Sequence, residues 1–245
     1  MGDDLRTRGA LERVAAMHAL ADDQVEQLAA FVDLLLGWRR ANVTGLTDPV
    51  AVVDTLIGDS LGLLNVPQLR EREGGAWLDL GAGAGIPGIP LAVALPGIRI
   101  TLLDAVAKKC VFLEAVVAAA GLSGRVDVVC ARSDRHAGAG APGREAYRVV
   151  LARAVAELAV LVELAAPLLA EGGVLLASKT RVALAREGDA AEAAGESCGL
   201  SVEPPIPLTA SPLDDAVCAV FRKTARAPEW LPRREGMAAK RPLGV

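Results

Sequence analysis

The chain of 245 residues is poor in aromatic side chains and in histidine. Aromatic residues make up 3% of the sequence, and the two histidines, His18 and His136, belong to no motif. Stacking of aromatic rings on nucleic-acid bases can therefore contribute little, and a nucleic-acid ligand would be bound mainly through its phosphates and its shape. The sequence also contains no catalytic triad, which argues against the enzyme classes that depend on one.

Cysteine and long apolar segments are also scarce. The four cysteines form no Cys-x-x-Cys pair and lie in apolar runs: Cys110, Cys130, Cys198 and Cys218. We expect these thiols to be reduced and buried, as in a cytoplasmic protein, and we expect no metal site. The most apolar region, residues 149–178, is interrupted by charged residues, proline and glycine, so it cannot cross a membrane as one helix. We expect no signal peptide, because Asp3, Asp4 and Arg6 precede any apolar segment.

Positive charge is limited overall but concentrated near the C-terminus. The net charge is −4, which by itself argues against a nucleic-acid-binding protein. Residues 222–245, however, carry a net charge of +5, which leaves −9 for the remainder of the chain. A basic tail on an acidic body is a candidate for contacts with phosphates, although a tail that only aids solubility would look the same.

A glycine-rich turn is the most informative feature of the sequence. The apolar run Trp77–Leu80 ends at Gly81, and Gly83 and Gly85 follow at alternate positions before a predicted helix. Glycine lets the backbone approach a ligand closely, and the start of a helix directs unpaired N–H groups toward the turn. A second apolar run then ends at Asp104, where an acidic side chain could bind the hydroxyls of a ribose. This pattern predicts a site for a nucleotide-like ligand.

Two ligand classes fit this turn. The spacing Gly83-x-Gly85-x-x-Gly88 satisfies the fingerprint of dinucleotide-binding proteins. The register Asp79-x-Gly81-x-Gly83-x-Gly85 is instead typical of enzymes that use S-adenosylmethionine (SAM). A carboxylate is unfavourable beside a pyrophosphate but suits a ligand with an ammonium and a sulfonium group. We therefore favour SAM as the cofactor, with a plain glycine-rich turn as a further interpretation.

The order of predicted elements supports this choice. Three helices are expected before the first strand, near residues 5–20, 22–40 and 48–66, and residues 132–143 are expected to form a loop. Strands are predicted at 77–80, 100–103, 126–130, 147–151, 173–177, 202–208 and 216–221, and helices at 89–95, 107–120, 152–169 and 181–197. The last two strands lack an intervening helix. This is the layout of an α/β, class I SAM-dependent methyltransferase, with a Rossmann-like, mostly parallel seven-stranded sheet and an antiparallel last strand.

The sequence divides into three regions. Residues 1–73 are expected to form an N-terminal helical extension, and Gly74-Gly75 marks the junction with the sheet. Residues 74–224 are expected to form the methyltransferase domain. Residues 225–245 form the basic C-terminal tail.

Longer motifs resemble one family closely. The resemblance runs from about Trp38 to Leu243 and rests on sequences spread along the chain. They are Trp38 with Asn42-Val43-Thr44, Leu78 to Leu91, Leu102-Leu103-Asp104, Lys108-Lys109 with Phe112-Leu113, Ala152-Arg153-Ala154, Ser178-Lys179, Pro232-Arg233-Arg234-x-Gly236 and Lys240-Arg241-Pro242-Leu243. The chain resembles the bacterial small-subunit ribosomal RNA guanine-N7 methyltransferases, also called glucose-inhibited division protein B.

The resemblance implies that SAM donates a methyl group to N7 of a guanine in 16S rRNA, either as RNA or in the small ribosomal subunit. It implies a cofactor site formed by Gly81, Gly83, Gly85, Ile86, Asp104, Ser133, Asp134 and Arg153. It places Arg153 and Lys179 at the reaction face, although an ion pair or a solvated strand-end lysine would explain them equally simply. The tail residues that would contact RNA phosphates, alone or folded back beside the cofactor cleft, are Arg233, Arg234, Lys240 and Arg241.

One departure from the family leaves alternatives open. The family usually carries His-x-x-Asp-Ser on the third helix, whereas this chain has Leu56 before Asp59-Ser60. If the histidine contacts RNA, this chain binds RNA more weakly or acts on another nucleic acid; if it only packs, the change has no consequence. A SAM-dependent methyltransferase acting on a small molecule and a nicotinamide-dependent oxidoreductase are therefore kept as alternatives.

Overall fold

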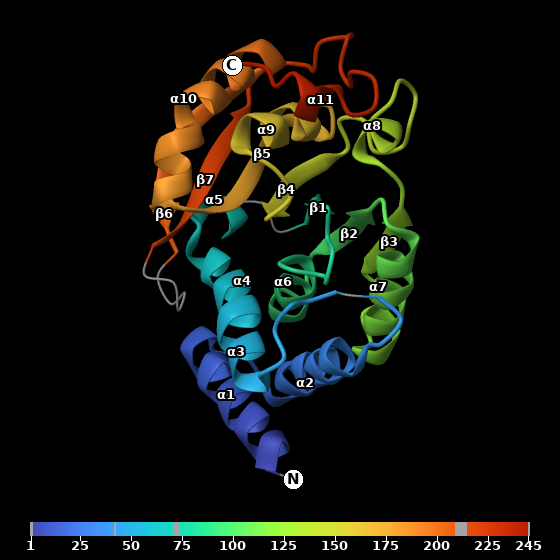
Figure 1. Ribbon diagram of the computed structural model, residues 1–245, viewed down its shortest axis with the longest axis vertical. Coiled ribbons are helices and arrows are strands. Elements are labelled where there is room, and N and C mark those ends of the chain that lie inside the picture. The colour runs from blue at the N-terminus through green and yellow to red at the C-terminus, as the bar shows by residue number, and fades with distance from the viewer. Residues whose placement is uncertain (1, 42, 71–73, 209–214, 245) are drawn as a thin grey trace.

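The computed structural model describes residues 2–41, 43–70, 74–208 and 215–244. These residues form a seven-stranded sheet with helices on both faces (Figure 1). The strands are β1 (Ala76–Leu80), β2 (Arg99–Asp104), β3 (Val126–Cys130), β4 (Tyr147–Arg153), β5 (Leu169–Thr180), β6 (Leu200–Pro207) and β7 (Ala216–Lys223). The helices are α1 (Gly2–His18), α2 (Asp22–Gly37), α3 (Pro49–Val52), α4 (Asp59–Gly62), α5 (Pro67–Arg70), α6 (Gly88–Ala94), α7 (Ala107–Ala119), α8 (Ser133–His136), α9 (Leu158–Ala165), α10 (Arg181–Cys198) and α11 (Met237–Lys240).

The strand order is β3-β2-β1-β4-β5-β7-β6. Strands β1 to β5 pair in parallel, whereas β7 is antiparallel to both β5 and β6. The chain first builds outward from β1 to β3 and then returns to place β4 on the other side of β1. Such a reversal leaves a crevice at the carboxyl ends of the central strands, where ligands bind in open α/β sheets. The predicted methyltransferase sheet with an antiparallel last strand is confirmed.

Two hydrophobic clusters cover the two faces of the sheet. Because successive strand residues point to opposite faces, Trp77 and Val149 belong to one cluster, whereas Leu78 and Val150 belong to the other. The first cluster includes residues of α1, α2, α6 and α7, and the second includes residues of α9 and α10. In Figure 1, α1 to α4 lie at the lower side of the view, and α9 and α10 lie at the upper side.

The N-terminal helices are joined to the sheet by a shared core and by hydrogen bonds. Phe31 of α2 is fully buried in the same cluster as Trp77 of β1. The Gln24 side chain donates to the Val93 carbonyl oxygen at 2.7 Å, and the Gln27 side chain donates to the Ala120 carbonyl oxygen at 2.8 Å. These carbonyls lie at the ends of α6 and α7, where helices leave acceptors unpaired.

The predicted third helix is present but irregular. Asp48 caps it as expected, since its carboxylate accepts the Ala51 N–H at 2.9 Å, and Pro49 occupies the first helical position. Between α3 and α4, the residues Val53–Gly58 form a π-helical segment, and the residues Leu63–Asn65 after α4 form a 3₁₀ turn. Short π-helical insertions are frequent at functional sites.

Several predicted elements and bounds were wrong, among them the start of the helix after β4, which is Leu158 and not residue 152. The expected loop at residues 132–143 contains the short helix α8, anchored by a 2.7 Å hydrogen bond between His136 Nε2 and the Tyr147 hydroxyl. The helix after β4 ends at Ala165 instead of near Leu169, because the carbonyl oxygens of residues 167 and 168 accept N–H groups of residues 145–147. Strand β5 therefore begins at Leu169, earlier than its apolar run suggested.

The shared core predicts that the helical extension and the sheet unfold together. Replacing Phe31 with alanine should lower the free energy of unfolding of the whole chain by about 3–5 kcal/mol, because it leaves a cavity in the common cluster. Urea denaturation followed by circular dichroism and by tryptophan fluorescence should show one transition at lower urea. Leu5→Ala, at a 72% exposed position on α1, is the control and should change little. A separate early transition that leaves the sheet unaffected would contradict this expectation.

Candidate active site at the carboxyl ends of the strands

The glycine turn follows β1 and lies against the end of β2. The N–H groups of Gly81 and Ala82 both donate to the Leu103 carbonyl oxygen, at 2.8 and 3.0 Å. The φ angles of Gly81, Gly83 and Gly85 are +70°, +57° and +81°. Residues with a side chain rarely adopt this left-handed region, which explains glycine at all three positions.

The three glycines differ in their surroundings. A Cβ atom on Gly81 would lie 2.9 Å from Val155 Cγ2, and one on Gly85 would lie 2.7 Å from Ile89 Cγ1. On Gly83, the nearest atom would be the Gly81 carbonyl oxygen at 3.7 Å. Gly81 and Gly85 therefore make room for protein packing, whereas a Cβ atom on Gly83 would meet its neighbours only at ordinary contact distance, so its φ angle is what requires glycine there.

Asp79 lies beneath the turn and does not face a ligand. Its side chain is fully buried, and Oδ2 accepts the Gly88 N–H at 2.8 Å. Burial raises the pKa of Asp79 to about 7, although the hydrogen bond from Gly88 opposes this shift. A Cβ atom on Gly88 would lie 2.7 Å from Asp79 Oδ2, so this position also requires glycine. The interpretation of Asp79 as the partner of charged ligand groups was wrong, because its carboxyl group instead fixes the start of α6.

Asp104 ends β2 and holds the turn from the other side. Its Oδ2 accepts the Gly83 N–H at 2.9 Å, and its Oδ1 accepts the Val106 N–H at 2.8 Å. The residue is 6% exposed. A carboxylate offers about four lone-pair positions, so each oxygen can still accept a hydroxyl group. Asp104 is thus oriented for further hydrogen bonds at the edge of the sheet.

A pocket of about 230 Å³, named here the β1–β2 pocket, opens beside Asp104. Its lining includes Gly81, Asp104, Arg132, Ser133 and Leu164. The structure therefore brings together three of the predicted cofactor residues, which are Gly81, Asp104 and Ser133. The pocket has both apolar and hydrogen-bonding groups, as expected for a nucleoside.

The other five predicted cofactor residues do not line this pocket: Gly83, Gly85, Ile86, Asp134 and Arg153. Ile86 is 8% exposed and belongs to the hydrophobic cluster beneath the turn. Asp134 lies behind Ser133, where its carboxylate accepts from Arg132 Nε at 3.3 Å and from the Arg135 N–H at 2.8 Å. Neither side chain is therefore placed at the surface of the β1–β2 pocket, although Asp134 contacts its lining residue Arg132.

A second pocket of about 240 Å³, named here the β4–β5 pocket, lies at the ends of β4 and β5. Asp59, Arg153, Ser178 and Lys179 are among its lining residues. Arg153 and Lys179, the two predicted reaction-face residues, thus share one pocket. Arg153 does not line the β1–β2 pocket, to which it was also assigned.

Arg153 is held by the helical extension. Its Nη2 donates to Asp59 Oδ2 at 2.9 Å and to the Thr55 carbonyl oxygen at 3.2 Å. Burial lowers the pKa of Arg153, and the Asp59 carboxylate opposes that shift, so the guanidinium stays protonated at neutral pH. Its Nη1 is buried and has no acceptor among the described residues. The following residue, Ala154, has a φ of +54°, a strained conformation that often marks functional sites.

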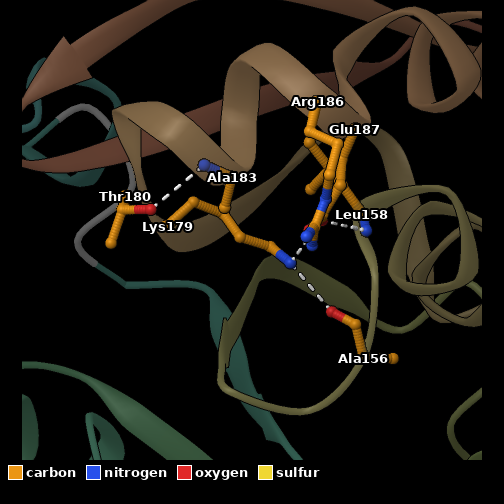
Figure 2. Close-up of polar contacts among 7 residues, drawn as sticks. All are labelled: Ala156, Leu158, Lys179, Thr180, Ala183, Arg186 and Glu187. Atoms are coloured by element: carbon orange, nitrogen blue, oxygen red, sulfur yellow. Dashed lines mark hydrogen bonds and ion pairs between the residues drawn. The ribbon is translucent and has the colours of Figure 1, made fainter.

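Lys179 is held by α10 and by the loop after β4. Its Nζ lies 2.7 Å from Glu187 Oε2 and donates to the Ala156 carbonyl oxygen at 2.9 Å (Figure 2). The Glu187 carboxylate also accepts from Arg186 and from the Leu158 N–H. Burial alone would raise the pKa of Glu187, but these hydrogen bonds outweigh it and lower the pKa. Lys179 is therefore not the freely solvated strand-end lysine that was considered.

The basic tail is folded onto the protein. Arg233 is bound to the buried Glu163 of α9, with 2.7 Å between Arg233 Nε and Glu163 Oε1. Arg234, Lys240 and Arg241 have exposed side chains. Of the four predicted RNA-binding residues, Arg233 is thus committed to an internal ion pair.

Sequence patterns missed the carboxylates that hold these cations. Glu187 and Glu163 lie within helices and belong to no motif, so no signal in the sequence marked them. Asp59 was noted only as part of the Asp59-Ser60 stretch, and its pairing with Arg153 joins residues 94 positions apart.

Among the described helices, none is long and apolar enough to cross a membrane. Within the part of the chain that the structure describes, no group of three or more His, Cys, Asp and Glu side chains is placed to hold a metal ion.

Comparisons with known proteins find relatives over most of the chain. The family model described as rRNA small subunit methyltransferase G matches residues 24–202. Ribosomal RNA small subunit methyltransferase G of Alkaliphilus oremlandii is 35% identical over 226 residues, which cover 91% of this chain and 92% of the relative. The protein of the same name from Desulfitobacterium hafniense is 33% identical over 236 residues, which cover 96% of each chain. A crystal structure of a predicted O-methyltransferase from Agrobacterium tumefaciens has a TM-score of 0.50 and 22% identity, covers 70% of this chain and 81% of that one, and shares the fold.

The buried Asp79 predicts a specific pH dependence of stability. Because its folded-state pKa of about 7 lies above the ordinary value near 4, the folded state binds a proton that the unfolded state releases between these values. Stability should therefore fall as the pH rises from about 4 to about 7, by up to about 1.4 kcal/mol per pH unit from this group. Asp79→Asn should flatten that fall in urea unfolding measured across the range, whereas the exposed Asp33→Asn should follow the unsubstituted protein. Parallel curves for Asp79→Asn and the unsubstituted protein would disprove the assignment.

Proposed function

This chain belongs to the rRNA small subunit methyltransferase G family, and on that premise we propose how its two pockets divide the reaction. The enzyme transfers a methyl group from SAM to N7 of a guanine in 16S rRNA. We assign the cofactor to the β1–β2 pocket and the target guanine to the β4–β5 pocket. We also place the enzyme in the cytoplasm, where it meets rRNA or the small ribosomal subunit.

The residues of the β1–β2 pocket fit SAM. Asp104 has unused lone pairs for the ribose hydroxyls, and the backbone of Gly81 lines the same pocket without a side chain. Ser133 lies where it could contact the adenine, while Ile86 and Asp134 lie outside the lining of the pocket. SAM, when bound, supplies an electrophilic methyl group on its sulfonium.

The reaction needs little general acid–base catalysis. Guanine N7 carries a lone pair at neutral pH, so no base must remove a proton before the methyl group is attacked. The protein needs to align N7 with the methyl carbon and to exclude water. Both pockets lie at the carboxyl ends of the central strands, with β4 beside β1, so their contents can meet at this edge.

The observation that carries the guanine assignment is the donor left on Arg153. Its Nη2 is used by Asp59 and Thr55, but Nη1 has no acceptor among the described residues. A buried donor without an acceptor is costly, and the guanine oxygen O6 would satisfy it. Arginine often binds both O6 and N7 of guanine, but a single contact to O6 would leave N7 available for methylation.

Lys179 and the tail are assigned to the RNA backbone. Lys179 uses two of its three N–H groups for Glu187 and the Ala156 carbonyl, which leaves one for a phosphate beside the β4–β5 pocket. The exposed Arg234, Lys240 and Arg241 are suited to phosphates farther away. Substrate shape would supply the remaining selectivity.

The substrate can be tested in cells. In a deletion strain of the source organism, nucleoside mass mapping of 16S rRNA should show the loss of one 7-methylguanosine. The unsubstituted gene should restore it, and a gene encoding Asp104→Ala should not. An unchanged nucleoside map in the deletion strain would refute rRNA as the substrate and would favour a small-molecule methyl acceptor.

The Arg153 assignment predicts a loss of turnover without a loss of cofactor. Arg153→Lys keeps the charge near Asp59 but removes the planar fork of donors. Its kcat on small ribosomal subunits should fall by about 10²-fold or more, on the scale of losing one donor in an active site. Its Kd for SAM, measured by calorimetry, should stay within about twofold, because Arg153 lines only the other pocket. Arg148→Lys, an exposed residue of the same strand, is the matched control, and equal kcat values for the two variants would refute the assignment.

A further inference from the structure

The C-terminal segment, residues 224–244, packs back over α9 and does not extend into solvent. Leu231 is 2% exposed, and its carbonyl oxygen accepts from Arg144 Nη1 at 2.8 Å. At its far end, Gly244 packs against α10, where an added Cβ atom would lie 2.9 Å from the Ala194 nitrogen. Figure 1 shows α11 between α9 and α8, with the C-terminus beside α10.

A buried ion pair fixes the middle of this segment. Arg233 Nε donates to Glu163 Oε1 at 2.7 Å, and Arg233 Nη2 donates to Glu163 Oε2. The same Nη2 donates to the Arg241 carbonyl oxygen at 2.7 Å, and this hydrogen bond links the residues before and after α11. Glu163 is 2% exposed, so removing its partner would leave a buried charge without compensation.

The segment also touches one wall of the β1–β2 pocket. Leu164, the residue after Glu163, and Arg132 line that pocket. On their other side, both residues line a small cavity of about 80 Å³ together with Arg233 and Arg234. Arg132 Nε lies 3.3 Å from Asp134 Oδ2 and 3.4 Å from Glu235 Oε1, so it links the loop beside Ser133 to the C-terminal segment.

We propose that the C-terminal segment is part of the cofactor site and that Arg233 and Glu163 are positioning residues for SAM. Arg233 fixes Glu163 and with it the neighbouring Leu164, and Glu235 helps to fix Arg132. Leu164 and Arg132 form one wall of the β1–β2 pocket, and this wall then keeps its shape around the nucleoside. This inference rests on the assignment of SAM to the β1–β2 pocket. It removes Arg233 from the residues available to RNA phosphates and leaves Arg234, Lys240 and Arg241 for that role.

Calorimetric titration of the full chain with SAM tests the proposal. Arg233→Gln and Glu163→Gln should each weaken SAM binding by about tenfold or more, because the first leaves the buried Glu163 carboxylate unpaired and the second releases the half-buried Arg233. The double variant should recover part of the affinity, since both charges are gone. Hydrogen exchange of Arg233→Gln without SAM should increase at residues 131–136, whereas exchange in β4 and β5 should stay unchanged. Arg226→Gln, an exposed position of the same segment, should match the unsubstituted enzyme.

Two further measurements separate this role from RNA binding and from general stability. Arg234→Gln should weaken binding to small ribosomal subunits without altering the Kd for SAM, which is the opposite of Arg233→Gln. If Arg233→Gln does not fold, Arg233→Lys should fold and bind SAM with intermediate affinity. Unchanged SAM affinity in the folded Arg233 and Glu163 variants would overturn the proposal. Failure of the proposed function would instead appear as an unsubstituted enzyme that does not methylate rRNA. The SAM titrations do not depend on that activity, so the two failures can be distinguished.

Discussion

The hydrogen bond from the Gly83 N–H to the Asp104 carboxylate fixes the glycine turn beside the β1–β2 pocket. It exists because of the register between β1 and β2, in which Asp79 pairs with Leu102 and Leu80 pairs with Leu103. Asp104 therefore extends one residue beyond the last pair, level with the start of the turn. The same register buries Asp79 beneath the turn, where it holds the start of α6. Two carboxyl groups on adjacent strands thus clamp the glycine turn from below and from the side.

Carboxylates also hold three of the six cations that the sequence marks as functional. Arg153 is paired with Asp59, Lys179 with Glu187, and Arg233 with Glu163, and each pair joins different elements of the fold. Buried pairs of this kind gain little stability, because removing both charges from water costs about as much as their attraction returns. Their contribution is that each carboxylate holds its cation in a fixed direction. A methyl transfer to a nitrogen lone pair requires alignment more than proton transfer, so preorganised side chains suit this chemistry.

Local sequence patterns predicted the fold and the cofactor edge but not these pairings. The alternation of apolar residues, the glycine spacing and the Asp48-Pro49 cap are local signals, and the sheet, the turn and the third helix follow from them. The role of Asp79 was misjudged because spacing alone does not distinguish a carboxyl group beside a ligand from one beneath a turn. Arg233 is separated from Glu163 by 70 residues, and only the packing of the last segment on α9 brings them together. Helix α8 was missed because its sequence is polar and rich in glycine at its end, whereas its anchor is the distant Tyr147.

The helical extension contributes directly to the β4–β5 pocket. Asp59 and the carbonyl oxygen of Thr55, which hold Arg153, both belong to the irregular helical segment before β1. Leu56, at the position where the family usually has histidine, is half-buried against the core cluster and follows Thr55 directly. The Thr55 contact is made by the backbone, and the Asp59 contact is made one turn later, so neither depends on the side chain at position 56. Arg153 can therefore be held in the same direction with leucine as with histidine, and the substitution changes packing beside the site while leaving its cation in place.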